Sequence, residues 1–326
     1  MTMYLPELDE FTKMMEQAGL VPLHRTVLAD LETVLTIFAK IAATDRHAFL
    51  FESMEGGEKW GRYSFIGLDP LLTFSSQGSQ ISMTRSGQDE EIRDNVNPLK
   101  ELRQLLASFK ASTAPGLPRF YGGLVGFLGY DMIRFIEEIP DSHEPLDIPD
   151  SSFIVPRLVL IHDSISQKLT VVCNVVPEKG KNAAELYADS CARIEAVLAK
   201  LRQPLPESLC TAAACDKHEF RSNMDEPTFC RMVEQAKERI LAGDIIQVVL
   251  SQRFQSKSQL DPFLLYRSLR HVNPSPYLFY LRLDDLFLIG SSPEILVRLE
   301  DNEIELRPIA GTRKRGANAE EDKALA

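Results

Sequence analysis

Short apolar runs separated by turn residues dominate residues 25–175 and predict a series of β-strands. The clearest runs are HAFLFES (47–53), RYSFIGL (62–68), LLTFSS (71–76), FIVPRLVLIHD (153–163) and LTVVCNVV (169–176). A turn containing Gly180 follows the last of them at 177–181. This part of the chain is therefore expected to form a sheet.

Helical periodicity appears in five stretches, namely 31–42, 97–111, 182–201, 226–242 and 262–272. Asp30 is the expected cap of the first. The fourth has the clearest ends, with Asp225 as its cap, Pro227 in the first turn and Gly243 as its stop.

Residues 203–218 contain two prolines and no periodicity, which is typical of a linker. We therefore expect a first domain over 1–205, a linker over 206–218 and a second domain over 219–326. The second domain has a predicted strand at 245–254. Four short strands then follow, YLFYLRL, LFLIG, EILVRL and EIELRPI, with connections short enough for an antiparallel meander.

The composition is that of a globular protein, with 326 residues, 44% apolar and 25% charged. The net charge of -11 argues against a nucleic-acid partner but not against a small anionic ligand. Five cysteines, an odd number without C-x-x-C spacing, predict free thiols in a reducing compartment. The start of the chain is acidic, unlike a signal peptide, and no apolar run is long enough for a membrane helix. We expect a cytoplasmic protein.

The segment RPIAGTRKRG (307–316) is the strongest candidate for ligand binding. Its small residues Ala310, Gly311 and Thr312 let a ligand approach backbone N–H groups, and three basic residues follow them. This combination suits a carboxylate-bearing ligand, although a solvated basic loop has the same composition.

Two further segments add to this. In GDIIQVVLSQRF, Gln247 is polar among apolar neighbours, which fits a ligand contact or the wet face of an edge strand. In GSSPEILVR, the polar residues at 291, 292 and 294 fit a site or a plain capped turn.

These motifs, together with NPSPYLFYLRL, occur in an order and spacing that resemble the chorismate-utilising enzymes. Residues 49–70 and 120–140 further resemble the N-terminal domain of anthranilate synthase large subunits. The resemblance covers nearly the whole chain. It implies an α+β fold in which antiparallel sheets pack as a sandwich with flanking helices, here C-terminally incomplete.

Two positions distinguish the branches of this family. Aminodeoxychorismate synthases typically carry a nucleophilic lysine at the position of Ala310, and isochorismate and salicylate synthases a water-activating lysine at that of Gln247. Alanine cannot form the covalent bond and a neutral glutamine is a poor general base. Both residues favour the anthranilate branch, with aminodeoxychorismate or isochorismate synthesis as the alternatives.

The resemblance also implies a feedback-inhibitor site for tryptophan. Its matching positions are Glu52, Ser53, Lys59, Pro276, Tyr277 and Leu278. A hydroxyl and a carboxylate can hold an ammonium group, and apolar residues an indole. Phe51 and Leu278 stand where other apolar residues are frequent, which should alter the pocket mildly.

The implied reaction converts chorismate and ammonia to anthranilate and pyruvate, the first step of tryptophan biosynthesis. Ammonia would come from glutamine through a separate amidotransferase subunit. Of the chorismate contacts, only Gly311 and Thr312 can be carried over. The glutamates that hold Mg²⁺ and the acid–base histidine lie beyond residue 326 in the family, so we expect no metal ligand here. The chain alone is expected to be an inactive, truncated large subunit. A chain that binds only tryptophan, without catalysis, is the non-enzymatic alternative.

Overall fold

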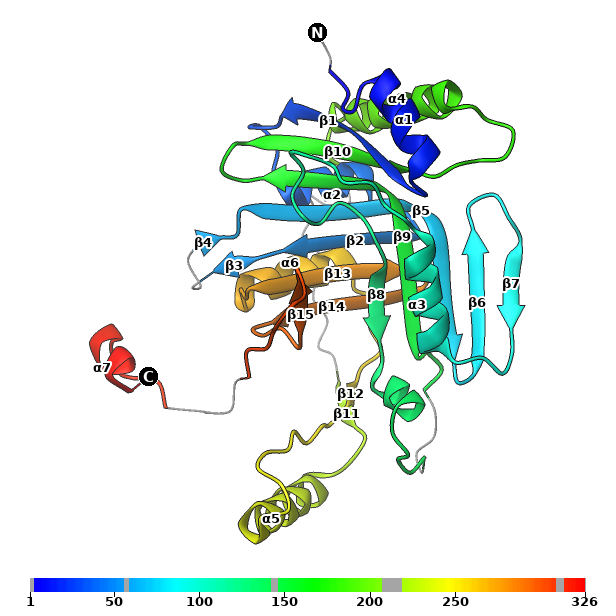
Figure 1. The fold of residues 1–326 in the computed structure, drawn as a ribbon. Coiled ribbons are helices and arrows are strands. Elements are labelled where there is room, and N and C mark those ends of the chain that lie inside the picture. The colour runs from blue at the N-terminus through cyan, green and yellow to red at the C-terminus, as the bar shows by residue number, and fades with distance from the viewer. Residues whose placement is uncertain (1–2, 56–58, 142–145, 207–218, 309–313, 326) are drawn as a thin grey trace. The chain divides into compact units, whose positions relative to one another are not determined.

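The computed structural model describes residues 3–55, 59–141, 146–206, 219–308 and 314–325 (Figure 1). The chain divides into two compact units. Unit 1 comprises Met1–Thr211 and Pro262–Pro293, and unit 2 comprises Ala212–Asp261 and Glu294–Ala326. The sequence-based division at 206–218 stays a prediction. The structure adds that residues 262–293 belong to the same compact unit as the N-terminal part, because they extend its sheet.

Unit 1 is built around one ten-stranded antiparallel sheet (Figure 1). Its main path runs β1 (Val21–Leu28), β10 (Lys168–Val175), β9 (Ser151–Asp163), β5 (Tyr63–Gln77), β2 (His47–Glu52), β13 (Tyr277–Leu283) and β14 (Leu286–Ser292). Off this path, β6 (Gln80–Arg85) pairs with β5 and β7 (Glu90–Arg93), and β8 (Val125–Leu128) pairs with β9. The runs predicted at 62–68 and 71–76 are one strand, whose register with β9 shifts between Pro70 and Leu72.

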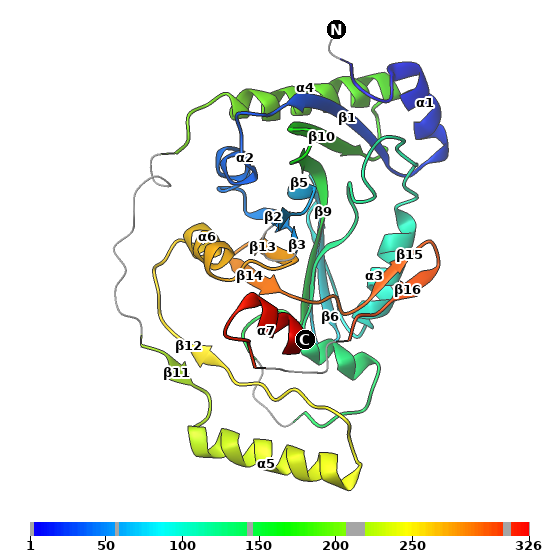
Figure 2. The ribbon, with the colours of Figure 1, turned by 90° about the vertical axis from the view of Figure 1, so that its left-hand side faces the viewer.

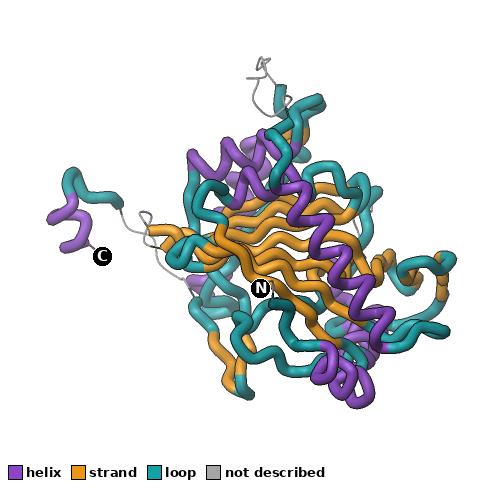
Figure 3. Tube along the Cα trace, turned by 90° about the horizontal axis from the view of Figure 1, so that it is seen from above, coloured by secondary structure: helices purple, strands orange, loops and turns teal. Residues whose placement is uncertain are grey.

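Four helices cover one face of this sheet. They are α1 (Leu8–Gln17), α2 (Val34–Ile41), α4 (Ala183–Leu201) and α6 (Pro262–Val272). All four supply side chains to the largest apolar cluster, together with alternate residues of the strands. Figure 2 shows α2 and α6 on the same side of the strands, and Figure 3 shows helices lying across them. The predicted α+β class, with antiparallel sheet and flanking helices, is confirmed, whereas the packing of sheets as a sandwich stays a prediction.

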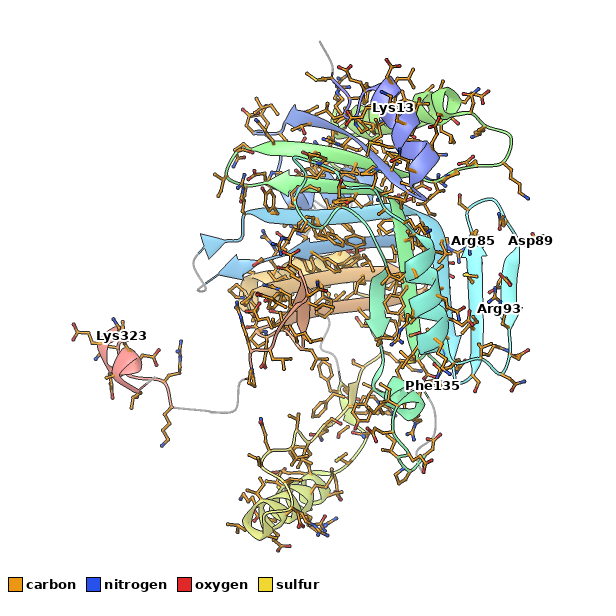
Figure 4. All side chains as sticks on the ribbon, viewed as in Figure 1. Lys13, Arg85, Asp89, Arg93, Phe135 and Lys323 are labelled. Atoms are coloured by element: carbon orange, nitrogen blue, oxygen red, sulfur yellow. The ribbon has the colours of Figure 1, made fainter. Side chains whose placement is uncertain are left out.

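Another helix, α3 (Pro98–Ser108), packs against the ends of β5 and β6 through Leu102 and Leu105. A short 3₁₀ helix, η1 (Tyr130–Phe135), follows β8. The hairpin of β6 and β7 ends the sheet on this side, and its outer strand is exposed throughout. Arg85, Asp89 and Arg93 project from this hairpin (Figure 4). Such charges on an edge disfavour pairing with another chain.

Most predicted helices begin and end where the sequence indicates. Asn182 caps α4 and Asp225 caps α5 (Glu226–Ala242), which Gly243 ends with a φ of 82°. The cap predicted at Asp30 is wrong. α2 begins later because the Thr33 hydroxyl accepts the N–H of Thr36. The helix α1 and the strands β1, β6, β7 and β8 were not predicted.

Unit 2 contains little regular sheet in the part of it that the structure describes. β11 (Arg221–Ser222) pairs with β12 (Phe254–Gln255), and β15 (Arg298–Glu300) pairs with β16 (Glu303–Glu305). α7 (Ala319–Leu325) ends the described chain. Of the meander predicted for 277–309, the β13–β14 hairpin forms as expected, while β15 and β16 make a separate two-stranded sheet.

The strand predicted at 245–254 is wrong except at its last residue. Its alternating pattern is present, but an extended segment becomes a strand only when a neighbour supplies hydrogen bonds. Ile246 and Val249 are exposed instead. Within the described ranges, no helix is both long and apolar enough to cross a membrane.

Candidate functional site

Glu52 is a buried carboxylate at the end of β2. Ala48 and Leu50 of the same strand belong to the cluster under the helices, and alternation along the strand directs Glu52 to the same face. Its side chain is only 1% exposed. A carboxylate buried this deeply requires charged or hydrogen-bonding partners.

Two residues of α6 supply these partners. The Tyr266 hydroxyl donates to Oε2 of Glu52 at 2.6 Å. Arg270 donates from Nε to Oε2 and from Nη2 to Oε1, both at 3.0 Å. Burial raises the pKa of Tyr266, and the negative charge of Glu52 raises it further. Tyr266 is therefore a hydrogen-bond donor at all physiological pH values, and both Glu52 oxygens are occupied.

Two further buried polar residues lie on β5 and β9, the next two strands of the sheet after β2. Ser64 of β5 and His162 of β9 are register partners, and both are buried. Nε2 of His162 has no hydrogen-bond partner among the described residues. Burial lowers the pKa of His162, while the charges of Asp163 and Glu52 oppose that shift. Burial therefore favours the neutral form of the His162 imidazole.

The sheet brings two distant predicted segments together. Glu52 of β2 and Leu278 of β13 are register partners in an antiparallel ladder. The connection from α6 to β13 is fixed at Asn273, whose N–H donates to the Leu269 carbonyl and whose carbonyl accepts the Ser291 hydroxyl at 2.5 Å. This connection carries Pro276 and leads into Tyr277, the first residue of β13, so both residues lie at the end of β13 that pairs with the Glu52 end of β2.

The opposite face of the same strands is aromatic. Phe51 of β2 and Phe279 of β13 are register partners and alternate with Glu52 and Leu278. Phe49, Phe65 and Phe120 belong to the same apolar cluster. The ring centroids of Phe49 and Phe51 are 4.8 Å apart, and those of Phe65 and Phe120 are 5.1 Å apart and perpendicular. Several of these rings are only half-buried, so this aromatic face can contact a planar apolar ligand.

The predicted inhibitor-site residues are thus divided between the two faces. Leu278 and the Glu52 carboxylate lie under the helices, in the core. Alternation places Tyr277 on the aromatic face with Phe279. Ser53 follows β2 and is half-buried, and its carbonyl accepts the Gly61 N–H at 2.7 Å.

The remaining candidates lie elsewhere. Gly311 and Thr312, and the side chain of Lys59, are outside the described residues. Gln247 belongs to unit 2 and is exposed in an irregular segment, because the strand expected to bury it does not form.

Tyr266, Arg270 and His162 were not identified from the sequence as candidate site residues. A signal for the first two was present, since residues four apart lie on one face of a helix and this face is otherwise apolar. His162 had no comparable signal, because a single histidine in an apolar strand does not indicate its neighbours.

Magnesium, which the resemblance implies, finds no fit among the described residues. No three or more His, Cys, Asp or Glu side chains gather there in an arrangement that could hold a metal ion. Glu52 is already neutralised by Arg270. We therefore derive no step through a metal.

A family model described as chorismate binding enzyme matches residues 46–326. Anthranilate synthase component 1 of Acetivibrio thermocellus is 39% identical over 330 residues, which cover 99% of this chain and 66% of that protein. The Aquifex aeolicus protein of the same name is 41% identical over 320 residues, which cover 98% and 64%. The chain thus spans slightly less than two thirds of the length of these relatives.

Two solved structures resemble the computed one. Anthranilate synthase component I from Streptococcus pneumoniae matches with a TM-score of 0.60 and 30% identity, over 75% of this chain and 53% of that chain. The menaquinone-specific isochorismate synthase from Escherichia coli matches with a TM-score of 0.53 over 98% of this chain and 62% of that one. Its identity of 17% makes it a likeness of fold alone.

Proposed function

Because this chain belongs to the family of chorismate binding enzymes, we propose that it serves as an anthranilate synthase large subunit. In this role it takes chorismate and ammonia to anthranilate and pyruvate, the first step of tryptophan synthesis. The observation that carries the proposal is the identity of about 40% with relatives named anthranilate synthase component 1, across almost the whole chain.

Two residues support this branch over the others. Ala310 offers no nucleophile for the covalent chemistry of aminodeoxychorismate synthesis, and Gln247 offers no base for the activation of water. Ammonia is itself a nucleophile and needs neither group. Gly311 and Thr312 remain the proposed chorismate contacts.

Product analysis tests the proposal. The protein that carries this chain is mixed with chorismate, Mg²⁺ and ammonium. The products are separated by chromatography, anthranilate is detected by its fluorescence, and pyruvate is measured by a coupled enzymatic assay. We expect anthranilate and an equal amount of pyruvate. Aminodeoxychorismate or isochorismate as the main product would contradict the branch, and the absence of any chorismate turnover would contradict the catalytic role.

We also propose that tryptophan binds as a feedback inhibitor beside the strand ends of β2 and β13. The aromatic face, with Phe51, Phe279 and Tyr277, offers the surface that an indole ring requires. Ser53 follows directly on β2 and offers a hydroxyl. The Glu52 carboxylate points to the other face, so it contributes by holding the strand end rather than by contacting an ammonium group.

Calorimetric titration with tryptophan on this chain tests the inhibitor site. We expect binding of tryptophan and much weaker binding of alanine, which lacks the ring. Tyr277→Ala should lower the affinity, and Tyr130→Ala is the matched control because Tyr130 is 82% exposed on η1. Equal heats for tryptophan and alanine would contradict the assignment. A chain that binds tryptophan in this assay and shows no turnover of chorismate would support the non-enzymatic alternative.

A partner and a compartment complete the proposal. The name component 1 of the relatives supports a second component, which we propose to be a glutamine amidotransferase that supplies ammonia. Mg²⁺ is the proposed cofactor, with ligands outside the described residues. The free thiols Cys173, Cys191 and Cys230 support a reducing, cytoplasmic location.

A further inference from the structure

Glu52 is linked to the α6–β13 segment at two separate points. Its backbone lies in the ladder opposite Leu278, and its carboxylate holds Arg270 and Tyr266 of α6. The chain between these points, residues 271–277, therefore has both ends fixed to the same residue of β2. That short connection contains Pro276 and Tyr277.

The geometry of the ion pair is suited to fixing a position. A guanidinium that donates two N–H bonds to one carboxylate defines distance and orientation together, which a lysine cannot do. Here the pair is buried on the Glu52 side, with Arg270 24% exposed and Glu52 1% exposed. Solvent therefore competes little for the bonds, and the third donor, Tyr266, is fully buried.

The position of the Glu52 side chain keeps it from contacting a ligand on the aromatic face. Its carboxylate is 1% exposed, accepts hydrogen bonds from α6 at both oxygens, and lies on the other face of the strands. A ligand on the aromatic face would meet the β2 strand end and Tyr277. The relative placement of these two elements is what the Glu52 carboxylate controls.

We propose that Arg270 and Tyr266 are positioning residues for the amino-acid inhibitor site, a role that rests on the proposed function. They hold Glu52, and through it they set the distance between the Ser53 end of β2 and the Pro276–Tyr277 end of β13. They do not touch the ligand. Their loss weakens tryptophan binding by misplacing one side of the site.

The test compares tryptophan affinity with thermal stability in five variants of the chain. Arg270→Lys keeps the charge and removes the two-point geometry, and we expect about tenfold weaker tryptophan binding with little change in melting temperature. Tyr266→Phe removes one donor and should act in the same direction by a smaller factor. Arg267→Lys is the matched control, because Arg267 lies on the same helix and is exposed.

The double variant Glu52→Gln, Arg270→Gln separates positioning from simple stability. It removes both charges together, so no buried charge is left alone and the melting temperature should recover relative to Arg270→Gln. We expect tryptophan binding to stay weak even so. Recovery of full affinity in the double variant, or unchanged affinity in Arg270→Lys, would overturn the proposal. If the unaltered chain does not bind tryptophan, the proposed inhibitor site itself fails, and this is seen before any variant is made.

Discussion

The ring of Phe49 occupies the space that a side chain at Gly67 would need. The two residues are register partners on β2 and β5, and a Cβ built on Gly67 would lie 2.0 Å from Cε1 of Phe49. Phe279 and Gly290 repeat this relationship on β13 and β14, with the Cβ 2.1 Å from Cζ of the ring. Both rings belong to the aromatic face, so each glycine makes room for one of them.

Gly67→Ala should destabilise unit 1, because Phe49 is fully buried and its ring has no free space to enter. We expect the free energy of unfolding to fall by roughly 1–3 kcal/mol, as for other overpacked cores. Denaturant unfolding followed by circular dichroism measures it. Phe49→Leu combined with Gly67→Ala should recover part of the loss relative to the sum of the single variants. Simple additivity would show that the two residues do not compete for space.

Gly290→Ala should have a different effect, because Phe279 is only half-buried and its ring can turn away. Stability should fall less than in Gly67→Ala. If tryptophan binds to the aromatic face as proposed, the displaced ring should weaken binding by about tenfold, as expected when a contacting group is misplaced. Calorimetry on the two variants checks this. Stronger loss of affinity in Gly67→Ala than in Gly290→Ala would contradict the placement of the ligand near Phe279.

The local sequence pattern was enough to predict elements whose ends and hydrogen bonds depend only on neighbouring residues. Helix α5 is an example, since Asp225, Pro227 and Gly243 define both of its ends within the chain itself. The segment 245–254 shows the limit, because its alternation says nothing about whether a partner strand exists. The local pattern could not predict the pairing of β13 with β2 either, because the paired residues lie more than two hundred positions apart in the sequence.

The site shows the same division. Resemblance to the family placed Glu52 and Leu278 in one site, and the structure makes them register partners. The resemblance does not reveal that the Glu52 carboxylate faces the helices. That orientation follows from strand alternation combined with the position of α6, whose Arg270 lies 218 residues after Glu52 in the sequence. Arg270 could be recognised as the partner of Glu52 only after the sheet had brought them together.

Asn182→Ala should loosen the start of α4. The Asn182 side chain accepts the N–H of Glu185 at 2.9 Å, and the Glu185 carboxylate accepts the N–H of Asn182 at 2.8 Å. Loss of such a cap costs about 1 kcal/mol of folding free energy. Thermal unfolding should show the loss. Glu185→Gln is the control, because an amide oxygen still accepts the bond, and a loss as large as that of Asn182→Ala would contradict the reciprocal cap.

Acid should destabilise the fold through three histidines that folding removes wholly or partly from water. Burial lowers the pKa of His162, and that of His24 and His47 as well. In the unfolded chain each imidazole titrates near 6.5, so between that pH and the lower folded pKa the unfolded state holds protons that the folded state does not. The histidine contribution is therefore complete above about pH 7 and is lost as the pH falls through 6.5 toward the folded pKa.

His162→Gln isolates one of these contributions. It removes the titrating group and keeps a polar side chain, so the free energy of unfolding should decline less between pH 7 and pH 5 than in the unaltered chain. The difference cannot exceed about 1.4 kcal/mol per pH unit for one proton. Denaturant unfolding at several pH values measures the slope. His271→Gln, at an exposed position at the end of α6, controls for the effect of a histidine-to-glutamine change in itself. If His162→Gln kept the slope of the unaltered chain, His162 would take up its proton equally in both states, and its imidazole would not be held neutral by burial.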